Sequence, residues 1–359
     1  MTRRYVVAER SVAALSSADL AGTTMQSVFL SMAIFLCQSI QVSSVTPRET
    51  PKDRVWDGMV YNFGHRWEGR TYAYDPETGK AENELRSVYQ LEFPDGGRTG
   101  FGTWRGWNVI KDGDTRVVPL SRETCIDRTS GSSTFQFAKA GVGAGGRCPV
   151  EFPVADGALE AILEDEDNRL LPQRKFIEIN FFHGAIRRGV VVTYVLEKEK
   201  RCYRRNSCIM VMNFRRASSG YRDDEEMEVE SMGISTVEKE AAAIPTSGGG
   251  AAGFYSSLTL KRSFDLSRED YLEHETRTIT KENIFNVENQ EEGYVFTTYP
   301  EGLFLCLPDS ISLEEEEPPG FEFQFGCDFH RDGGPIKLLR VKYDRKKQLL
   351  GWRLHELLK

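Results

Sequence analysis

The sequence has few of the residues that common catalytic and metal sites require. Of its 359 residues only 5 are histidines, and its 7 cysteines form no C-x-x-C pair. Cys202 and Cys208 have a spacing unlike that of a compact zinc site, and a disulfide between them is the alternative. No serine–histidine–acid set and no H-E-x-x-H motif occurs. The sequence therefore predicts no metal site and no cofactor. It leaves open only an enzyme whose site is assembled from distant residues.

An excess of basic residues is also lacking. The chain has 46 Lys and Arg residues against 54 Asp and Glu residues, a formal net charge of −8. Proteins that bind nucleic acids need a basic surface for the phosphates, so the composition argues against a nucleic-acid partner. The short basic run at 198–205 is typical of a solvated loop. With 40% hydrophobic residues, the chain has the composition of an ordinary globular protein.

No apolar run is long enough to span a bilayer comfortably. The apolar stretch from Val28 to Cys37 is short and its surroundings are interrupted by Gln and Ser, so we expect no stable membrane span. Residues 1–24 contain several Arg, Ser, Ala and Thr residues and few acids. Together these features predict a signal-like or transit-like leader over residues 1–50. An amphipathic helix on the folded domain is the alternative.

The sequence is rich in short segments with the pattern of β-strands. Trp56 to Phe63 has the spacing of one short helix, with Gly64 as its stop signal. After it, apolar and polar residues alternate in segments separated by Pro-Gly and Asp-Gly turns, which predicts an antiparallel meander closing into a barrel or sandwich. Residues 139–149 are glycine-rich but lack the lysine of a phosphate loop, so they predict a flexible loop. Residues 158–172 predict one or two helical turns.

One strand–turn–strand pattern occurs twice. Residues 176–183 read FIEINFFH and residues 323–330 read FQFGCDFH, so Phe and Phe-His have the same spacing in both. A glycine-containing turn and a strand ending in tyrosine, Tyr194 or Tyr343, follow each copy. In both copies the histidine lies at a strand end beside a turn, so we expect a turn or rim role for it rather than catalysis.

The repeat predicts two related β-domains in tandem. The first covers residues 51–216 and the second residues 254–359. Between them, residues 217–253 combine an acidic run with a Gly- and Ala-rich stretch, which is typical of a linker.

Arginines and aromatic residues of these strands are the candidate functional residues. An arginine at the end of a small barrel can stack on a tryptophan, which contributes about 1–2 kcal/mol when desolvated. Arg187 or Arg188 in the first repeat and Arg340 in the second fit this role, with Trp67 as the partner in the first. The aromatic residues either line a cavity or fill the core. The candidates for ligand binding or barrel closure are Trp67, Tyr72, Tyr74, Trp104, Arg188, Tyr194, Arg340 and Tyr343.

Four segments resemble a known family: RWEGRTYAYDPETG, FIEINFFHGAIRRGVVVTY, YPEGLFLCLPDSI and LLRVKYDRKKQLLGWRLHELLK. The family is domain of unknown function 3598, from cyanobacteria and plastid-bearing organisms. The resemblance implies a mainly β fold of tandem antiparallel lipocalin-like (calycin) barrels with few helices. It also implies a plastid destination for the leader, with secretion as the alternative. The insert at 217–253 departs from the family pattern.

Three functions fit these features. The first is non-catalytic binding or carriage of a small hydrophobic or amphipathic ligand, such as a fatty acid, a pigment or a tetrapyrrole, in a barrel cavity. An arginine would then pair with a ligand carboxylate. The second is a protein similar to the bilin lyases, which attach chromophores. The third is a pocketless assembly factor that binds a protein complex.

Overall fold

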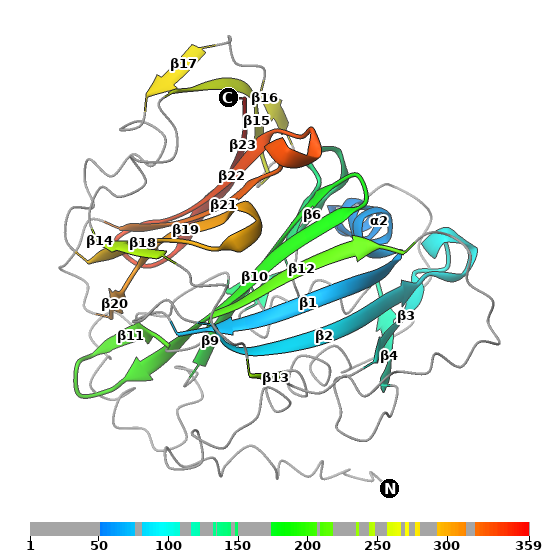
Figure 1. The fold of residues 1–359 in the computed structure, drawn as a ribbon, viewed down its shortest axis with the longest axis horizontal. Helices are drawn as coiled ribbons and strands as arrows, with labels where there is room; N and C mark the ends of the chain where they lie inside the picture. Colours follow the sequence, from blue (N-terminus) through cyan, green and yellow to red (C-terminus); the bar gives the residue numbers. More distant parts are fainter. Residues whose placement is uncertain are drawn as a thin grey trace, which may run out of the picture.

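The structure, a computed structural model, shows a mainly β protein built from two antiparallel sheets. Figure 1 shows the sheets as two curved layers that lie against each other. The expected leader at 1–50 and the helical turns expected at 158–172 lie outside the described residues. The structure describes residues 51–75, 81–107, 116–122, 132–133, 135–144, 148–149, 174–206, 209–217, 235–236, 244–247, 257–266, 270–272, 277–280, 293–313 and 320–358.

The N-terminal unit begins with the helix α2 (Pro51–Phe63), which ends at Phe63 as the sequence predicts but begins before the predicted start at Trp56. The N–H of Gly64 donates to the carbonyl of Val60 at 2.9 Å and ends the helix. The strands that follow are β1 (Arg66–Tyr74), β2 (Ala81–Glu92), β3 (Phe101–Trp107), β4 (Arg116–Ser121), β6 (Gln136–Phe137), β7 (Val142–Ala144), β9 (Arg174–His183), β10 (Ile186–Glu197), β11 (Cys202–Arg205) and β12 (Ile209–Arg216).

The order of this sheet is β4-β3-β2-β1-β12-β10-β9-β7-β6. The first strand of the unit, β1, therefore pairs with the last, β12. A separate two-stranded sheet joins β5 (Ser132–Ser133) to β8 (Cys148–Pro149). The 3₁₀ helices η2 (Pro94–Gly97) and η4 (Ala138–Ala140) connect strands of the unit.

The C-terminal unit is the second sheet, with the order β14-β18-β19-β21-β22-β23-β15-β16. Again the first long strand, β15, pairs with the last, β23. The 3₁₀ helices η7 (Pro300–Gly302) and η8 (His330–Asp332) lie between strands. The strands are β14 (Ile244–Ser247), β15 (Ser257–Asp265), β16 (Asp270–Leu272), β17 (Arg277–Thr280), β18 (Tyr294–Thr298), β19 (Leu303–Pro308), β21 (Phe321–Asp328), β22 (Ile336–Tyr343) and β23 (Leu349–Leu358). The short strand β20 (Ser310–Ser312) comes from this part of the chain but pairs into the N-terminal sheet.

Both units repeat one strand order: β7-β9-β10-β12-β1-β2 corresponds to β19-β21-β22-β23-β15-β16. The hairpins β9–β10 and β21–β22 are the two copies seen in the sequence. Their register differs from the sequence alignment, which pairs Phe176 with Phe323. Phe176 lies on the face that carries Glu178, whereas Phe323 lies on the opposite face of its own strand from Glu322. Because side chains alternate along a strand, an alignment that is off by an odd number of residues exchanges the two faces of a sheet.

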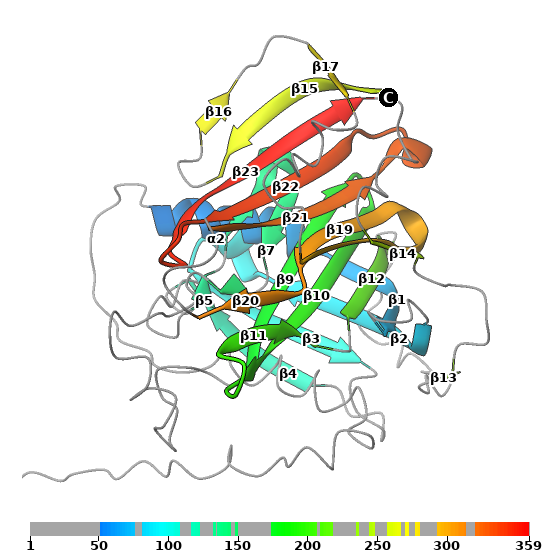
Figure 2. The same ribbon diagram turned by 90° about the vertical axis from the view of Figure 1, so that its left-hand side faces the viewer.

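The two sheets pack face to face on a shared core. We call the two surfaces that meet the joint faces and the opposite surfaces the far faces. On β10, Val190, Val192 and Tyr194 belong to the joint face, whereas Val191 belongs to the far face. The two units are also joined by a ladder between β11 and β20, with Tyr203 opposite Ile311. Figure 2 shows these two strands side by side below the second sheet.

Two segments differ from their sequence-based predictions. The glycine-rich stretch 139–149 is not simply a loop, because β7 forms within it and pairs with β9. On its other edge, β7 pairs with β6, and Gly143 leaves room for the side chain of Gln136 there, since a Cβ would come within 1.9 Å of it. Within 217–253, the expected linker, the structure places the short strand β13 (Ser235–Thr236) on β2 and β14 on β18.

Candidate functional site

The far face of the N-terminal sheet is filled by side chains. The helix α2 lies on it and contacts β6 and β7 on one side and β2 and η2 on the other. Each ring that packs there removes apolar area from water and contributes on the order of 2–3 kcal/mol. The buried members of this cluster are Trp56, Met59, Phe63, Trp67, Ala73, Tyr89, Leu91, Phe182, Val191, Met212 and Phe214.

A buried polar triad lies within this cluster, on β9 and β10. Arg187 Nε donates to Asn180 Oδ1 at 3.0 Å, and Asn180 Nδ2 donates to Glu178 Oε1 at 3.0 Å. The guanidinium lies over the rings of Phe63 and Phe214, 4.6 Å and 5.3 Å from their centroids. Burial lowers the pKa of Arg187 to about 10, and the carboxylate of Glu178 opposes that shift. The triad is therefore sealed between the sheet and α2.

The C-terminal sheet carries the corresponding triad on β21 and β22. Gln324 Nε2 donates to Glu322 Oε1 at 2.8 Å, and Arg340 Nε donates to the same oxygen at 2.6 Å. The side chain of Arg340 is 22% exposed, whereas that of Arg187 is 6% exposed. Both hairpins thus hold a carboxylate, an amide and an arginine on their far faces. Arg340 of the C-terminal triad is more exposed to water than Arg187 of the N-terminal triad.

Beyond this triad, the C-terminal far face is lined by apolar side chains. A second small core of seven buried residues forms there, between β15, β18, β19, β22 and β23. Its polar neighbour is the pair Ser263 and His355, whose Oγ and Nδ1 atoms are 2.6 Å apart. The members of the core are Leu260, Phe296, Phe304, Cys306, Ile336, Leu338 and Leu357.

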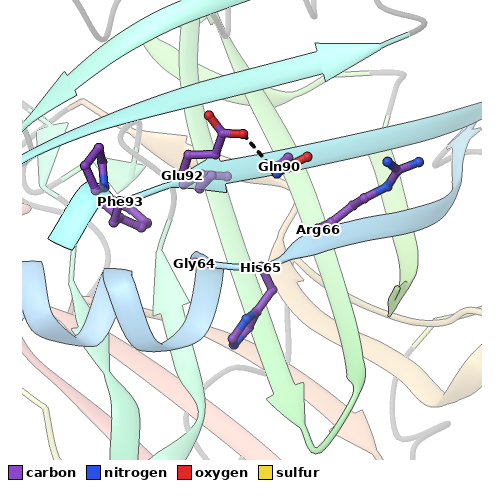
Figure 3. A pocket seen from close by; sticks show the side chains of 8 residues that line it. Gly64, His65, Arg66, Gln90, Glu92 and Phe93 are labelled. Carbon is purple, nitrogen blue, oxygen red and sulfur yellow. Dashed lines mark hydrogen bonds between the residues drawn. The ribbon is translucent and has the colours of Figure 1, made fainter. Parts of the chain in front are cut away.

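An open cleft of about 390 Å³ lies where α2 passes into β1. Figure 3 shows Gln90 and Glu92 joined by a hydrogen bond on one side of β1, while His65 extends to the other side. Burial lowers the pKa of His65, with Arg216 adding to the effect, so its imidazole is neutral at pH 7. The cleft is lined by Gly64, His65, Arg66, Gln90, Leu91, Glu92, Phe93 and Pro94.

Charged side chains also cross the joint between the units. Arg188 donates to the carbonyl of Asp328 and to Asp332 Oδ2, both at 2.9 Å, and its guanidinium lies over Phe329. From the other unit, Lys337 is 4% exposed and its Nζ donates to the carbonyls of Ala140 and Phe182.

Burial lowers the pKa of Lys337 to about 8, with the nearby carboxylate of Glu356 opposing the shift. The pKa of His183, whose ring packs on Phe329, is also lowered, first by burial and then by Lys337. His183 is the last residue of β9, so it lies at a strand end beside a turn. His330 lies exposed in η8.

The candidate residues named from the sequence lie in three separate places. Tyr74, Tyr194 and Tyr343 are buried in the joint, where Tyr194 Oη donates to the carbonyl of Pro308 at 2.7 Å and Tyr343 stacks on Phe321. Tyr72 packs against the same core. Trp67 and Trp104 belong to the N-terminal far face. Arg340 lies on the C-terminal far face, and Arg188 crosses the joint.

The expected stacking of an arginine on Trp67 is wrong. The arginine of the N-terminal far face, Arg187, packs on Phe63 and Phe214, while Trp67 contacts Phe182 and His65. The helix α2 brings Phe63 over the guanidinium, a tertiary contact that no local pattern contains.

Sequence reasoning missed the two triads and Lys337. The signal for the triads was the spacing Glu-x-Asn in β9 and Glu-x-Gln in β21, each on alternate positions of a strand and each followed by an arginine in the returning strand. No local signal marks Lys337, because its carbonyl partners belong to the other unit.

The remaining chemistry of the described residues is sparse. Cys202, Cys306 and Cys327 are free thiols, and Cys208, the possible disulfide partner of Cys202, lies outside the described residues. Burial raises the pKa of Cys306 and of Cys327 to about 12, which makes them poor nucleophiles.

Among the described residues, no group of three or more His, Cys, Asp or Glu side chains is placed to hold a metal ion. Within the same residues, no helix is both long enough and apolar enough to cross a membrane.

Comparisons with known proteins found similarity among solved structures only. No family model matches the chain, and no curated protein matches it. Among solved structures, the chain is similar to a protein of unknown function from the DUF3598 family of Nostoc punctiforme PCC 73102, with a TM-score of 0.46 and 11% sequence identity. The match covers 85% of this chain and 98% of that one. This neighbour comes from the family that the sequence patterns resemble.

Proposed function

We propose that each unit is a lipocalin-like β-barrel and that the two barrels stand in tandem. The pairing of the first strand with the last, β1 with β12 and β15 with β23, supports this proposal. A meander closes into a barrel only when its terminal strands become neighbours. In the N-terminal unit, α2 contacts β6 and β7 at one end of the strand order and β2 farther along it, as expected of a helix that lies over the end of such a barrel.

We propose that the protein is a non-catalytic binder of a small amphipathic ligand and that the C-terminal unit binds it. The observation that carries the proposal is the contrast between the two far faces. Aromatic rings and α2 fill the N-terminal one and seal Arg187. The C-terminal one combines an apolar core with Arg340, whose side chain is more exposed. Ligand sites are typically apolar surfaces with a few placed polar groups.

The test is to purify the full chain from its own organism and to record its native mass spectrum and its absorbance spectrum. A lipid or pigment of defined mass that leaves the protein on denaturation is the expected result. The apo protein should then bind a fluorescent fatty acid or a bilin at one site per chain.

Two outcomes would contradict this function in different ways. A chain that carries no small molecule and binds neither probe would favour the assembly-factor alternative, in which both far faces are filled. A chain that transfers a bound bilin to an acceptor protein would favour the lyase-like alternative.

A further inference from the structure

Three basic side chains meet at one buried ring in the joint. The ring belongs to Phe329, which follows β21 and is fully buried. The guanidinium of Arg188 lies 5.1 Å from the centroid of this ring, and Lys337 Nζ lies 5.9 Å from it. The ring of His183 packs on it as well, with the two centroids 5.5 Å apart. Aromatic faces attract cations, so this ring already holds two charges, one from each unit.

His183 connects β9 to the turn η8. Its imidazole hydrogen-bonds to the backbone of Asp332. The ring also fills the space beside Gly334, where a Cβ would come within 2.7 Å of it. The last residue of a strand in the N-terminal unit is therefore packed into a turn of the C-terminal unit.

The carboxylates of this turn already have partners. Asp332 Oδ2 accepts a hydrogen bond from Arg188 at 2.9 Å. Asp328 Oδ1 accepts one from the backbone N–H of His330 at 2.8 Å. Neither carboxylate can therefore turn toward His183 without giving up the contact that it makes now.

Other charged groups on the surrounding elements do not supply a counter-charge either. Glu356 on β23 accepts a hydrogen bond from Arg262 of β15. A proton on His183 would therefore add a positive charge beside Lys337. Among the described residues, the remaining charged or titratable side chains beside this contact are basic: Lys337 on β22, Arg188 on β10, Lys139 on η4, and His330 and Arg331 on η8.

The protonation of His183 follows from these surroundings. Burial lowers its pKa, Lys337 lowers the pKa further, and the carboxylates of Asp332 and Glu356 oppose the shift. The imidazole is therefore neutral at pH 7 and takes up a proton only below its ordinary pKa of 6.5.

We propose that the contact between β9 and η8 is acid-sensitive, and that protonation of His183 releases η8 from β9 while the two sheets stay packed on each other. The imidazolium is repelled by Lys337, and its charge is better solvated when the turn moves away from it. One added charge acts at the end of the joint, whereas the apolar core that the sheets share extends along whole strands. The release therefore changes the surface at Phe329 and Arg188, and it does not depend on ligand binding.

The experiment follows backbone hydrogen exchange of the full chain at pH 7.5 and pH 5.5 by mass spectrometry, with rates corrected for the intrinsic effect of pH. Peptides that cover residues 328–335 should lose protection severalfold at pH 5.5. The loss should be at most about tenfold, because one proton changes an equilibrium by no more than a factor of ten per pH unit. Peptides from β19, in the shared core, should keep their protection.

His183→Gln is the main variant, since its amide can still donate to the backbone of Asp332 but does not titrate. Residues 328–335 of this variant should exchange alike at the two pH values. His330→Gln removes an exposed histidine of the same turn, so it is the matched control and should respond to pH as the wild type does. In an NMR titration of the wild type, the imidazole signal that His183→Gln lacks should titrate below pH 6.5.

Three results would overturn the proposal. Equal protection of residues 328–335 in the wild type at both pH values would show that the contact holds when His183 is protonated. A response to pH that persists in His183→Gln would belong to another group. A parallel loss of protection in β19 would show that acid loosens the whole joint rather than this turn.

Discussion

The two units of this protein share one strand order and one polar triad, and they differ in what covers the triad. In the N-terminal unit, α2 and two phenylalanine rings enclose Arg187. In the C-terminal unit, Arg340 keeps part of its surface in water beside a second arginine. The same local motif is therefore enclosed in one unit, while its arginine is partly open to water in the other. What covers the motif, rather than the motif itself, sets this difference.

The largest effect is expected when the arginine of each triad is replaced. Arg187→Met should lower the free energy of unfolding by about 3–5 kcal/mol, because it leaves the buried Glu178 without its guanidinium. Arg340→Met should cost at least as much, because it removes the direct partner of Glu322, whose side chain is 4% exposed against 12% for Glu178. Urea denaturation of both variants measures the two losses, and a clearly smaller loss in Arg340→Met would contradict this ranking.

Contacts between the two units can be removed without changing either triad. Lys337→Met removes the ammonium donor from the carbonyls of Ala140 and Phe182 and should cost about 1–3 kcal/mol. We expect one calorimetric unfolding transition for the wild type and two for this variant. Lys342→Met, at an exposed position on the same strand, is the control. A single transition at an unchanged temperature in Lys337→Met would contradict this role of the joint.

The joint should also respond to pH. The pKa of Lys337 falls from its ordinary 10.5 to about 8 in the folded protein, so between these values the unfolded chain binds more protons than the folded one. The free energy of unfolding should therefore rise with pH across this window, by at most about 1.4 kcal/mol per pH unit. The lowered pKa of His183 acts in the same direction, with stability lost as the pH falls below its ordinary value of 6.5. Stability curves of the wild type and Lys337→Met should differ in slope above pH 8, and parallel curves would refute the assignment.

The smallest effect is expected at the turn between β9 and β10 and at the corresponding turn between β21 and β22, since both contain a glycine with a positive φ. Gly184 and Gly333 have φ values of 55° and 75°, and a Cβ at either position would meet nothing within 4 Å. Replacing either by alanine should cost about 1 kcal/mol, from the left-handed backbone alone. Thermal unfolding measures both, and a clearly larger loss at one turn would show that the turns are not equivalent.

Much of the fold could be predicted from local sequence signals. The helix that ends before Gly64, the strand at Tyr72 and Tyr74, and the two β9–β10-like hairpins all follow from periodicity and turn residues. The strand β7 could not be predicted, because a Val-Gly-Ala segment has low strand propensity and becomes a strand only by pairing with β9. The arginine partner was misassigned because the helix that supplies Phe63 reaches the guanidinium through the tertiary fold.

The sequence by itself determined the strands, the turns and the duplication, because side-chain alternation and turn chemistry act over a few neighbouring residues. It also contained the residues of both triads. In each triad the carboxylate and the amide are two residues apart on one strand, and the arginine lies on the next strand. Only the tertiary structure decided that Tyr194 and Tyr343 pack in the joint, that Lys337 reaches carbonyls of the other unit, and that Arg340 stands beside Arg353. Burial and charge pairing depend on which faces meet. In a two-sheet protein that choice is made by packing between segments more than a hundred residues apart.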